Sequence, residues 1–327
     1  MTKLLDAFVG SLVADALAMP GHWYYDRQAL RRDYGWLSEY TEPRNPHPDS
    51  ILWRSHYKPK SEEADILHDQ AKYWGQRGIH YHQFLKAGES TVNLKLAVEL
   101  YLLISRSGVY DTQAWLERYI ELMRTPGWHG DTYVEEYHRG FFERLANGKS
   151  PEKCGIRDEH IGGLSQVPAL VSALAPDFNT VEIVKQHVAL THRHSNVLRA
   201  AGCLTRLILA VEAGSSLRDA IMREAGDWIS TRKASSMLLR PDTEIIGSVY
   251  SPACYIDQSF PAALYLAFKY HDDFSAGIIA NAMVGGDNCH RGVVVGALLG
   301  VANSIEPKWF EGLKAKDVLT ACGGGIR

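Results

Sequence analysis

The chain has 327 residues with 35 basic and 38 acidic side chains, which gives a formal net charge of −3. Hydrophobic residues make up 46% and charged residues 22%, so the chain can bury enough apolar surface to offset its conformational entropy. These proportions exclude a predominantly disordered protein, and the near-zero charge argues against a nucleic-acid binder that neutralises phosphates.

Membrane insertion and secretion also have little support. The most apolar runs, residues 94–104 and 292–302, are shorter than the roughly 20 residues of a bilayer-spanning helix. Asp6 and Asp15 interrupt the apolar N-terminus, which therefore does not resemble a signal peptide. The five cysteines are odd in number and scattered, so we expect no disulfide framework and a cytoplasmic location.

Apolar residues recur almost everywhere with the 3.6-residue period of an α-helix. Gly285 and Gly286 follow one of these segments, where a left-handed helix C-cap is expected. The segments that we expect to be helical are 4–16, 92–104, 115–123, 137–145, 181–190, 217–229, 259–270 and 275–284.

No segment alternates apolar and polar residues between turn signals, so strands have little support. The expected fold is all-α: a single domain over residues 1–327, built as a compact orthogonal bundle of a dozen or more helices. Residues 40–83 are polar, aromatic and weakly periodic, and a long excursion of this kind is often functional.

Asp15 is the first candidate functional residue, because it lies within an otherwise apolar helix. A buried carboxylate is costly unless it has a partner or a ligand. A capping or salt-bridge role near the helix end explains it equally well.

Oxygen-bearing side chains gather at the start of the apolar helix 92–104, in the order Glu89, Ser90, Thr91. They suit N-capping, and they would equally suit a hard cation or a sugar hydroxyl.

A polar turn joins two apolar segments near the C-terminus and contains Asp287, Asn288, Cys289 and His290. The small residues that follow, from Gly296 to Gly300, would let two helices approach closely, but packing alone does not explain the polar turn. A well-satisfied loop between helices is the alternative interpretation.

Two further loops are less specific. Gly162 and Gly163 precede an apolar helix, where backbone amides can hold a phosphate, although a Gly-Gly pair is a weak signal. His192 lies in a polar stretch between two helices, and a histidine there is more often a cap than a catalyst.

Taken together and in this order, these segments resemble the ADP-ribosylglycohydrolase family, which removes ADP-ribose from protein side chains. The similarity runs from Gly10 to about Phe310. The matching segments are Asp15 to Pro20, Gly88 to Thr91, Pro126 to Thr132 with His129 and Gly130, Gly162 to Leu164, Thr191-His192, Gly285 to Asp287, and Ile305 to Trp309.

The resemblance implies two magnesium ions held by carboxylates, but this sequence departs from that pattern. The first set of ligands reads Gly88-Glu89-Ser90, and the second reads Asp287-Asn288-Cys289-His290. Because thiol and imidazole serve magnesium poorly, we expect either one ion, bound weakly at Asp287, or none. This altered pattern is closest to the J1-crystallin and selenoprotein J branch.

The resemblance implies hydrolysis of a glycosidic bond at the ribose of an ADP-ribosyl or related nucleotide conjugate. Asp15, Glu89 and Asp287 would then bind the ribose hydroxyls. Cys289, beside His290, is either a thiol nucleophile or an inert buried thiol, and the second is the more common case for such residues. We expect these five residues to line one cleft. The expected ligand-binding residues are Ser90, Thr91, His129, Gly130, Gly162, Gly163, His192 and Asn288.

Two other classes of function stay open. One is a catalytically inactive ADP-ribose-binding pseudoenzyme, and the other is a crystallin-like structural protein. The expected partner is a small molecule or an ADP-ribosylated substrate, with no nucleic acid and no membrane, and the chain is expected to be a monomer or a small homo-oligomer.

Overall fold

The computed structural model describes residues 2–174 and 179–321, and within these ranges all regular structure is helical, with only isolated β-bridges. The all-α prediction is confirmed. The α-helices are α1 (Lys3–Ala18), α2 (Arg27–Tyr34), α3 (Val92–Ser107), α4 (Thr112–Arg124), α5 (Glu136–Ala146), α6 (Val167–Ala173), α7 (Thr180–Ala189), α8 (Ser195–Glu212), α9 (Leu217–Glu224), α10 (Thr231–Met237), α11 (Asp242–Glu244), α12 (Ile256–Lys269), α13 (Phe274–Met283), α14 (Asn288–Ala302), α15 (Pro307–Glu311) and α16 (Lys316–Ala321).

Seven short helical turns complete the fold. They are the 3₁₀-helices η1 (Met19–Gly21), η2 (Leu52–Arg54), η3 (Glu62–Ala64), η4 (His68–Tyr73), η5 (Pro151–Lys153) and η6 (Ile161–Leu164) and the π-turn η7 (Ile245–Val249). The polar stretch 40–83 contains only η2, η3 and η4, as its weak periodicity indicates.

Each expected helix is present, and one of them is shorter than its apolar pattern. The pattern 217–229 predicts a helix through Ile229, but α9 ends at Glu224. Ala225 leaves helical geometry and Gly226 follows it, which favours a helix end. Ile229 is nevertheless buried, so its side chain is part of the hydrophobic core although the residue lies beyond the end of the helix.

The sequence predicts no segment that is long and apolar enough to span a membrane, and the N-terminal helix is an exception to that prediction. Residues Lys3–Gly21 are long and apolar enough by composition, but 94% of the 18-residue window is buried inside the protein, as for a core helix. Cys154, Cys203, Cys254 and Cys289 are free thiols. Cys322 lies outside the described residues.

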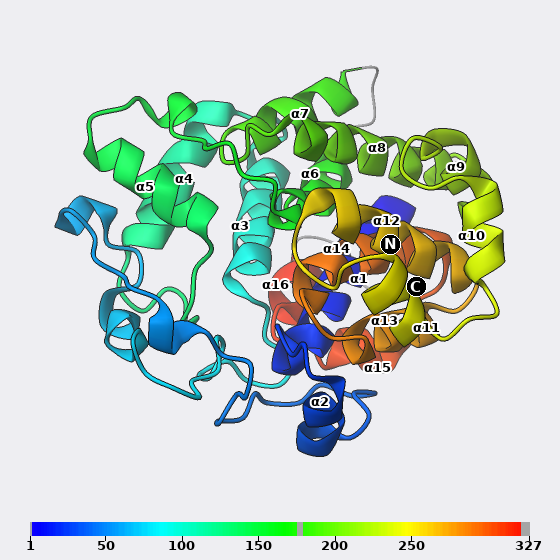
Figure 1. The fold of residues 1–327 in the computed structure, drawn as a ribbon. Helices are drawn as coiled ribbons and strands as arrows, with labels where there is room; N and C mark the ends of the chain where they lie inside the picture. Colours follow the sequence, from blue (N-terminus) through cyan, green and yellow to red (C-terminus); the bar gives the residue numbers. More distant parts are fainter. Residues whose placement is uncertain (1, 175–178, 322–327) are drawn as a thin grey trace.

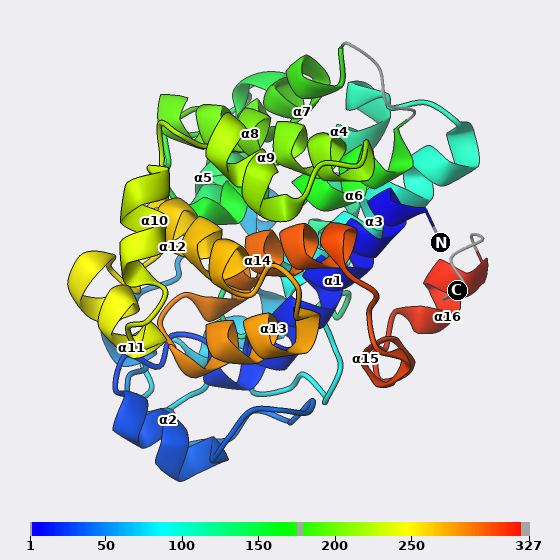
Figure 2. The ribbon, with the colours of Figure 1, turned by 90° about the vertical axis from the view of Figure 1, so that its right-hand side faces the viewer.

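Helices α1 and α14 lie side by side in the middle of the molecule (Figure 1, Figure 2). Glycines at their contact allow the backbones to touch. A Cβ atom added to Gly10 would lie 2.2 Å from the carbonyl oxygen of Gly296, and one added to Gly300 would lie 2.3 Å from that of Asp6. The small residues of α14 therefore permit the close helix approach that the sequence indicates.

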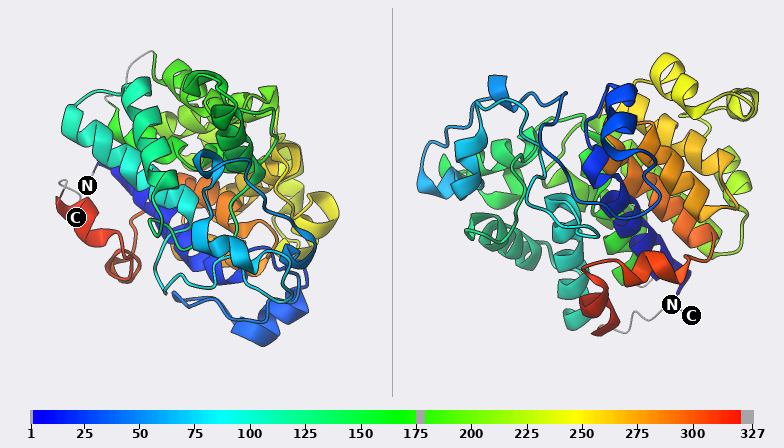
Figure 3. Two further views of the ribbon diagram at one scale, coloured as in Figure 1. Left: turned by 90° about the vertical axis from the view of Figure 1, so that its left-hand side faces the viewer. Right: turned by 90° about the horizontal axis from the view of Figure 1, so that it is seen from below.

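The other helices surround this central pair. Helices α12 and α13 pack against α14 on one side, and α6 and α8 contact the pair as well. Helix α3 lies toward the opposite side of the molecule, next to the stretch 40–83 (Figure 1, Figure 3). The start of α1 lies near α15 and α16 (Figure 3).

The turn between α13 and α14 fixes the position of the segment that follows α1. Gly285 and Gly286 have φ of +67° and +65°, which confirms the predicted left-handed turn. The Gly286 N–H donates to Tyr24 O at 2.7 Å, and the Trp23 N–H donates to Gly286 O at 2.8 Å. These bonds bring His22 next to Asp287, at the N-terminus of α14.

The glycine contact predicts a large effect of a single methyl group. Gly296→Ala places a Cβ 2.1 Å from Gly10 O, so the two helices must separate, and we expect the free energy of unfolding to fall by about 2–3 kcal/mol. Urea unfolding measures this change. Gly226→Ala is the control, since a Cβ at Gly226 meets nothing within 4 Å. Equal stability of the two variants would contradict the backbone contact.

Candidate active site

Asp287 is the centre of a buried polar network. It is fully buried at the N-cap of α14. Its Oδ1 lies 3.0 Å from His22 Nε2 and 2.7 Å from Nδ1 of His290, which is on the first turn of the same helix. Its Oδ2 has no hydrogen-bond partner and lies 3.6 Å from His160 Nε2, which is also unpartnered.

His290 links Asp287 to a second buried carboxylate, Glu135, at the N-cap of α5. His290 Nε2 lies 3.3 Å from Glu135 Oε1 and 3.0 Å from Asn93 Nδ2. The Asn93 amide also donates to Glu135 Oε2 at 3.2 Å, while its carbonyl accepts from the Tyr137 hydroxyl at 2.6 Å. Helices α3, α5 and α14 therefore meet at this point.

On its other side, Asp287 connects to a line of histidines. His22 Nδ1 lies 2.7 Å from His82 Nε2, and His82 Nδ1 lies 2.7 Å from Asp131 Oδ1. His129 packs at the far end, with Nδ1 3.8 Å from Asp131 Oδ2. We define the Asp287 cluster as the six linked residues Asp131, His82, His22, Asp287, His290 and Glu135.

Burial and pairing act in opposite directions on the charges of this cluster. Burial alone would raise the pKa of Asp287, but the His290 charge and the hydrogen bonds of His22 and His290 hold it well below its usual range. The pKa of Glu135 is likewise lowered against burial by its bond with His290. Burial opposes the charge of His290, yet Asp287 and Glu135 raise its pKa well above the usual value. Burial lowers the pKa of His22 to about 3.

An open cavity of about 460 Å³, which we call the aromatic cavity, lies beside this cluster. Glu135 and His160 connect it to the Asp287 cluster. Asp49, Ile51, Arg54 and Tyr81, which line the cavity, come from the stretch 40–83. The lining residues are Trp23, Tyr25, Asp49, Ile51, Arg54, Tyr81, Tyr133, Glu135, Glu136, Asp158, His160, Cys254 and Tyr255.

Asp15 has its partner in Thr91, at the N-cap of α3. It accepts the Thr91 N–H and the Thr91 hydroxyl, both at 2.9 Å, and burial raises its pKa to about 6. Both carboxylate oxygens are therefore occupied by the start of a helix. The Cys289 thiol lies 3.7 Å from Asp15 O, and burial raises its pKa well above the usual value, so a thiolate is disfavoured.

The structure does not bring Glu89 into the Asp287 cluster. Glu89 Oε1 forms an ion pair with Lys95 at 2.6 Å, and Oε2 accepts the Lys86 N–H at 3.0 Å. Glu89 and Ser90 line a different cavity of about 260 Å³, together with Trp128. Asp15, Asp287, Cys289 and His290 do not line the aromatic cavity either, and the expectation that the five residues line one cleft stays a prediction.

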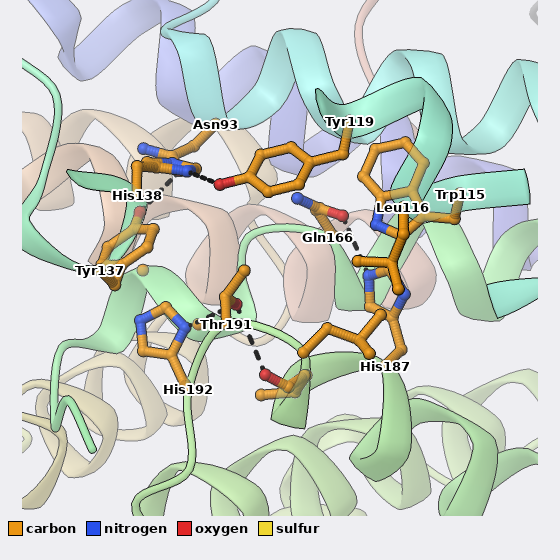
Figure 4. A pocket seen from close by; sticks show the side chains of 14 residues that line it. Asn93, Trp115, Leu116, Tyr119, Tyr137, His138, Gln166, His187, Thr191 and His192 are labelled. Carbon is orange, nitrogen blue, oxygen red and sulfur yellow. Dashed lines mark hydrogen bonds between the residues drawn. The ribbon is translucent and has the colours of Figure 1, made fainter. Parts of the chain in front are cut away.

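The two glycines expected to bind phosphate each contact a histidine. The Gly162 N–H donates to His160 Nδ1 at 2.9 Å, so it orients that imidazole. A Cβ on Gly163 would lie 2.9 Å from Cγ of His192, so this glycine allows close packing. Both glycines and His192 line a small enclosed cavity of about 20 Å³, next to Tyr137 (Figure 4).

The remaining predicted ligand-binding residues have local partners. His129 Nε2 donates to Ile66 O at 2.8 Å, and Gly130 packs against Phe84 and Leu85. The Asn288 side chain donates to Ala282 O at 3.0 Å and closes the turn between α13 and α14.

The donor set around Asp287 does not suit magnesium. Magnesium requires near-octahedral oxygen coordination, whereas the atoms nearest to Asp287 Oδ1 are imidazole nitrogens. At the other expected ligand positions, Glu89 is paired with Lys95 and Cys289 presents a thiol. The residues at these positions therefore do not fit a magnesium ion.

Sequence reasoning missed His22, Glu135 and His160 as functional candidates. His22 carries a usable signal, since it directly follows the Pro20-Gly21 end of a singled-out motif. Glu135 beside Glu136 reads as an ordinary acidic helix start, and His160 has no local signal beyond its place before Gly162. Only tertiary contacts identify these two residues.

Comparison with known proteins gives a family and a fold. The family model of ADP-ribosylglycohydrolase matches residues 1–324. A solved structure described as an ADP-ribosylglycohydrolase-related protein complex is similar, with a TM-score of 0.65 at 19% sequence identity, covering 98% of this chain and 95% of that one. At this identity the similarity shows the fold alone. No curated protein sequence matches the chain.

Buried neutral histidines predict a loss of stability in acid. His187 on α7 contacts Tyr110 and Gln166, and burial lowers its pKa to about 3. The unfolded chain takes up a proton near pH 6.5, so the stability is full above that pH and falls as the pH drops toward 3. At pH 5 the loss from one such group is about 2 kcal/mol.

His187→Gln should therefore reduce the loss of stability between pH 7 and pH 5 by about 2 kcal/mol relative to the parent protein. Urea unfolding at the two pH values measures it. His56→Gln is the control, because His56 is exposed. The same pH dependence in His187→Gln and in the parent would show that His187 does not stay neutral in the folded protein.

Proposed function

Because the chain belongs to the ADP-ribosylglycohydrolase family, we propose that it hydrolyses a glycosidic bond at the ribose of an ADP-ribosyl or related nucleotide conjugate. One observation carries the proposal: a buried carboxylate, Glu135, and an unpartnered imidazole, His160, meet at the aromatic cavity. A negative charge and a hydrogen-bond donor to the leaving group, both beside the anomeric carbon, promote glycoside hydrolysis.

The walls of the cavity fit a nucleotide conjugate. Trp23 and Tyr81 lie edge to face with ring centroids 4.6 Å apart, and Tyr133 contacts both, which builds an aromatic wall for a base or a sugar face. Arg54 offers a guanidinium for a phosphate, and Asp158 offers an acceptor for hydroxyls.

Glu135 supplies negative charge to the transition state. The transition state of glycoside hydrolysis resembles an oxocarbenium ion, so an ionised carboxylate beside the ring stabilises it. His290 keeps Glu135 ionised by lowering its pKa. The same carboxylate can accept a proton from the attacking water.

His160 supplies a hydrogen-bond donor. Its Nδ1 accepts the Gly162 N–H, so in the neutral imidazole the proton is on Nε2. This N–H has no partner and lies beside Asp287 Oδ2, which is also free to accept a bond from water or a substrate hydroxyl. The Nε2–H of His160 can therefore donate a hydrogen bond to the leaving-group oxygen or nitrogen, while the Gly162 N–H holds the imidazole in place.

The inactive binding protein is the main rival, and it differs only in turnover. The crystallin-like alternative has less support, since a purely structural protein needs no unpartnered polar atoms beside a cavity. The J1-crystallin and selenoprotein J branch stays a prediction from the sequence. Free thiols agree with a reducing compartment such as the cytoplasm.

Substitution of two glutamates tests whether catalysis depends on Glu135, which the structure places at the aromatic cavity, or on Glu89, which the sequence predicts. Glu135→Gln keeps the shape and removes the charge, so we expect turnover of an ADP-ribosyl conjugate to fall by about 10²–10⁴. Glu89→Gln should leave turnover within about twofold, because Glu89 pairs with Lys95. Steady-state kinetics on both variants measures this. The reverse ranking would move the active site to the Glu89 cavity.

Asp287 and Cys289 form a second pair of tests. Asp287→Asn should abolish turnover, since it removes the charge that organises His22 and His290. Cys289→Ser should retain most activity, because a buried thiol with a raised pKa is a poor nucleophile. A loss of several orders of magnitude in Cys289→Ser would establish a thiolate mechanism instead.

Binding without turnover would favour the inactive rival. A ligand that binds only the folded state raises the melting temperature. If ADP-ribose raises it for the parent and for Glu135→Gln alike, and no conjugate is hydrolysed, the chain is a binding protein.

A further inference from the structure

Three buried atoms that could coordinate a metal ion lie close together between the end of α1 and the start of α14. They are His22 Nε2, Asp287 Oδ1 and His290 Nδ1, and all lie within 4.8 Å of one another. The two nitrogens lie 3.0 Å and 2.7 Å from the same carboxylate oxygen. The three side chains are at most 1% exposed, so water does not screen them.

The line of contacts from Asp131 to Asp287 needs one more proton or cation than two neutral imidazoles provide. Three close contacts join Asp131, His82, His22 and Asp287 in a line, at 2.7, 2.7 and 3.0 Å. Each contact needs one hydrogen or one cation between its two atoms. Ionised carboxylates carry no proton and each neutral imidazole carries one, so two neutral imidazoles satisfy two of the three contacts. The third contact takes either a further proton, which makes one imidazole an imidazolium, or a metal cation.

A cation at the Asp287 end completes the line. His82 then donates to Asp131, and His22 donates to His82, which leaves the lone pair of His22 Nε2 directed at the cation. His290 fits the same arrangement, since its Nε2–H can donate to Glu135 while Nδ1 faces Asp287. Asn93 Nδ2 also lies near His290 Nε2, and it has an acceptor of its own in Glu135 Oε2.

The type of donor indicates the type of metal. Two imidazole nitrogens and one carboxylate oxygen suit borderline ions such as Zn²⁺, whereas magnesium requires oxygen. Behind His22, the His82–Asp131 pair forms the carboxylate–histidine arrangement that orients a metal-bound imidazole. On the cavity side, unpartnered Asp287 Oδ2 and His160 Nε2 mark a polar space for a further ligand.

We propose that His22, Asp287 and His290 bind one divalent transition-metal ion of the Zn²⁺ class, in place of the magnesium that the family resemblance implies. The site adjoins the residues of the proposed hydrolase, but metal binding is measured without any substrate. Its outcome is therefore independent of whether the chain hydrolyses glycosides.

The test uses the full chain after removal of metals with a chelator. Isothermal titration with Zn²⁺ and, separately, with Mg²⁺ should show one Zn²⁺ per chain and an affinity for Mg²⁺ that is at least about 100-fold weaker. Zn²⁺ should also raise the melting temperature. Loading with Co²⁺ gives a second measurement on the unaltered protein, because histidine-bound Co²⁺ absorbs in the visible range.

Substitutions locate the ion. His22→Asn and His290→Asn should each weaken Zn²⁺ binding by about 100-fold or more, and His82→Asn, which acts through His22, by about 10-fold. His187→Gln is the matched control: a buried histidine that contacts Tyr110 and Gln166 and should leave the affinity unchanged. Circular dichroism checks that each variant is folded.

Three results would overturn the proposal: no bound Zn²⁺ and no Co²⁺ spectrum in the parent, tighter binding of Mg²⁺ than of Zn²⁺, or Zn²⁺ binding that survives in folded His22→Asn and His290→Asn. If Zn²⁺ binds as expected while Glu135→Gln hydrolyses conjugates like the parent, the metal site stands and the proposed catalytic role of Glu135 falls.

Discussion

The contact between the backbones of α1 and α14 positions the rest of the site. Glycines at Gly10, Gly296 and Gly300 allow it, and any side chain there would force the helices apart. With the helices in contact, the turn that follows α1 bonds to the turn that precedes α14, and His22 faces Asp287. A packing constraint among small residues thereby fixes a polar contact between residues 265 positions apart.

The second constraint is the cost of burying carboxylates. Asp287, Glu135 and Asp131 are all buried, and each needs a partner that compensates its lost hydration. Histidines supply that compensation here, which explains why so many of them meet in one region. The same histidines make the site unsuitable for magnesium and suitable for a softer cation.

The sequence predicts the fold well because helical periodicity and the small residues of α14 are local features. It also singles out Asp287 and His290 as members of one polar turn, and because they stand three positions apart at the start of α14, a hydrogen bond joins them. Glu89 and Glu135 show the limit. Both stand at the start of a helix, and only the arrangement of α3 and α5 decides which one is buried beside His290 and which one pairs with Lys95. His160 likewise depends on contacts across the fold.

A crystal structure of the chain with ADP-ribose bound would decide between the two cavities. We expect the ligand to occupy the aromatic cavity, with its anomeric carbon between Glu135 and His160 and a ring stacked near Trp23 or Tyr81. Ligand bound instead in the cavity of Glu89, Lys95 and Trp128, with the aromatic cavity empty, would rule out a catalytic role of Glu135 and His160.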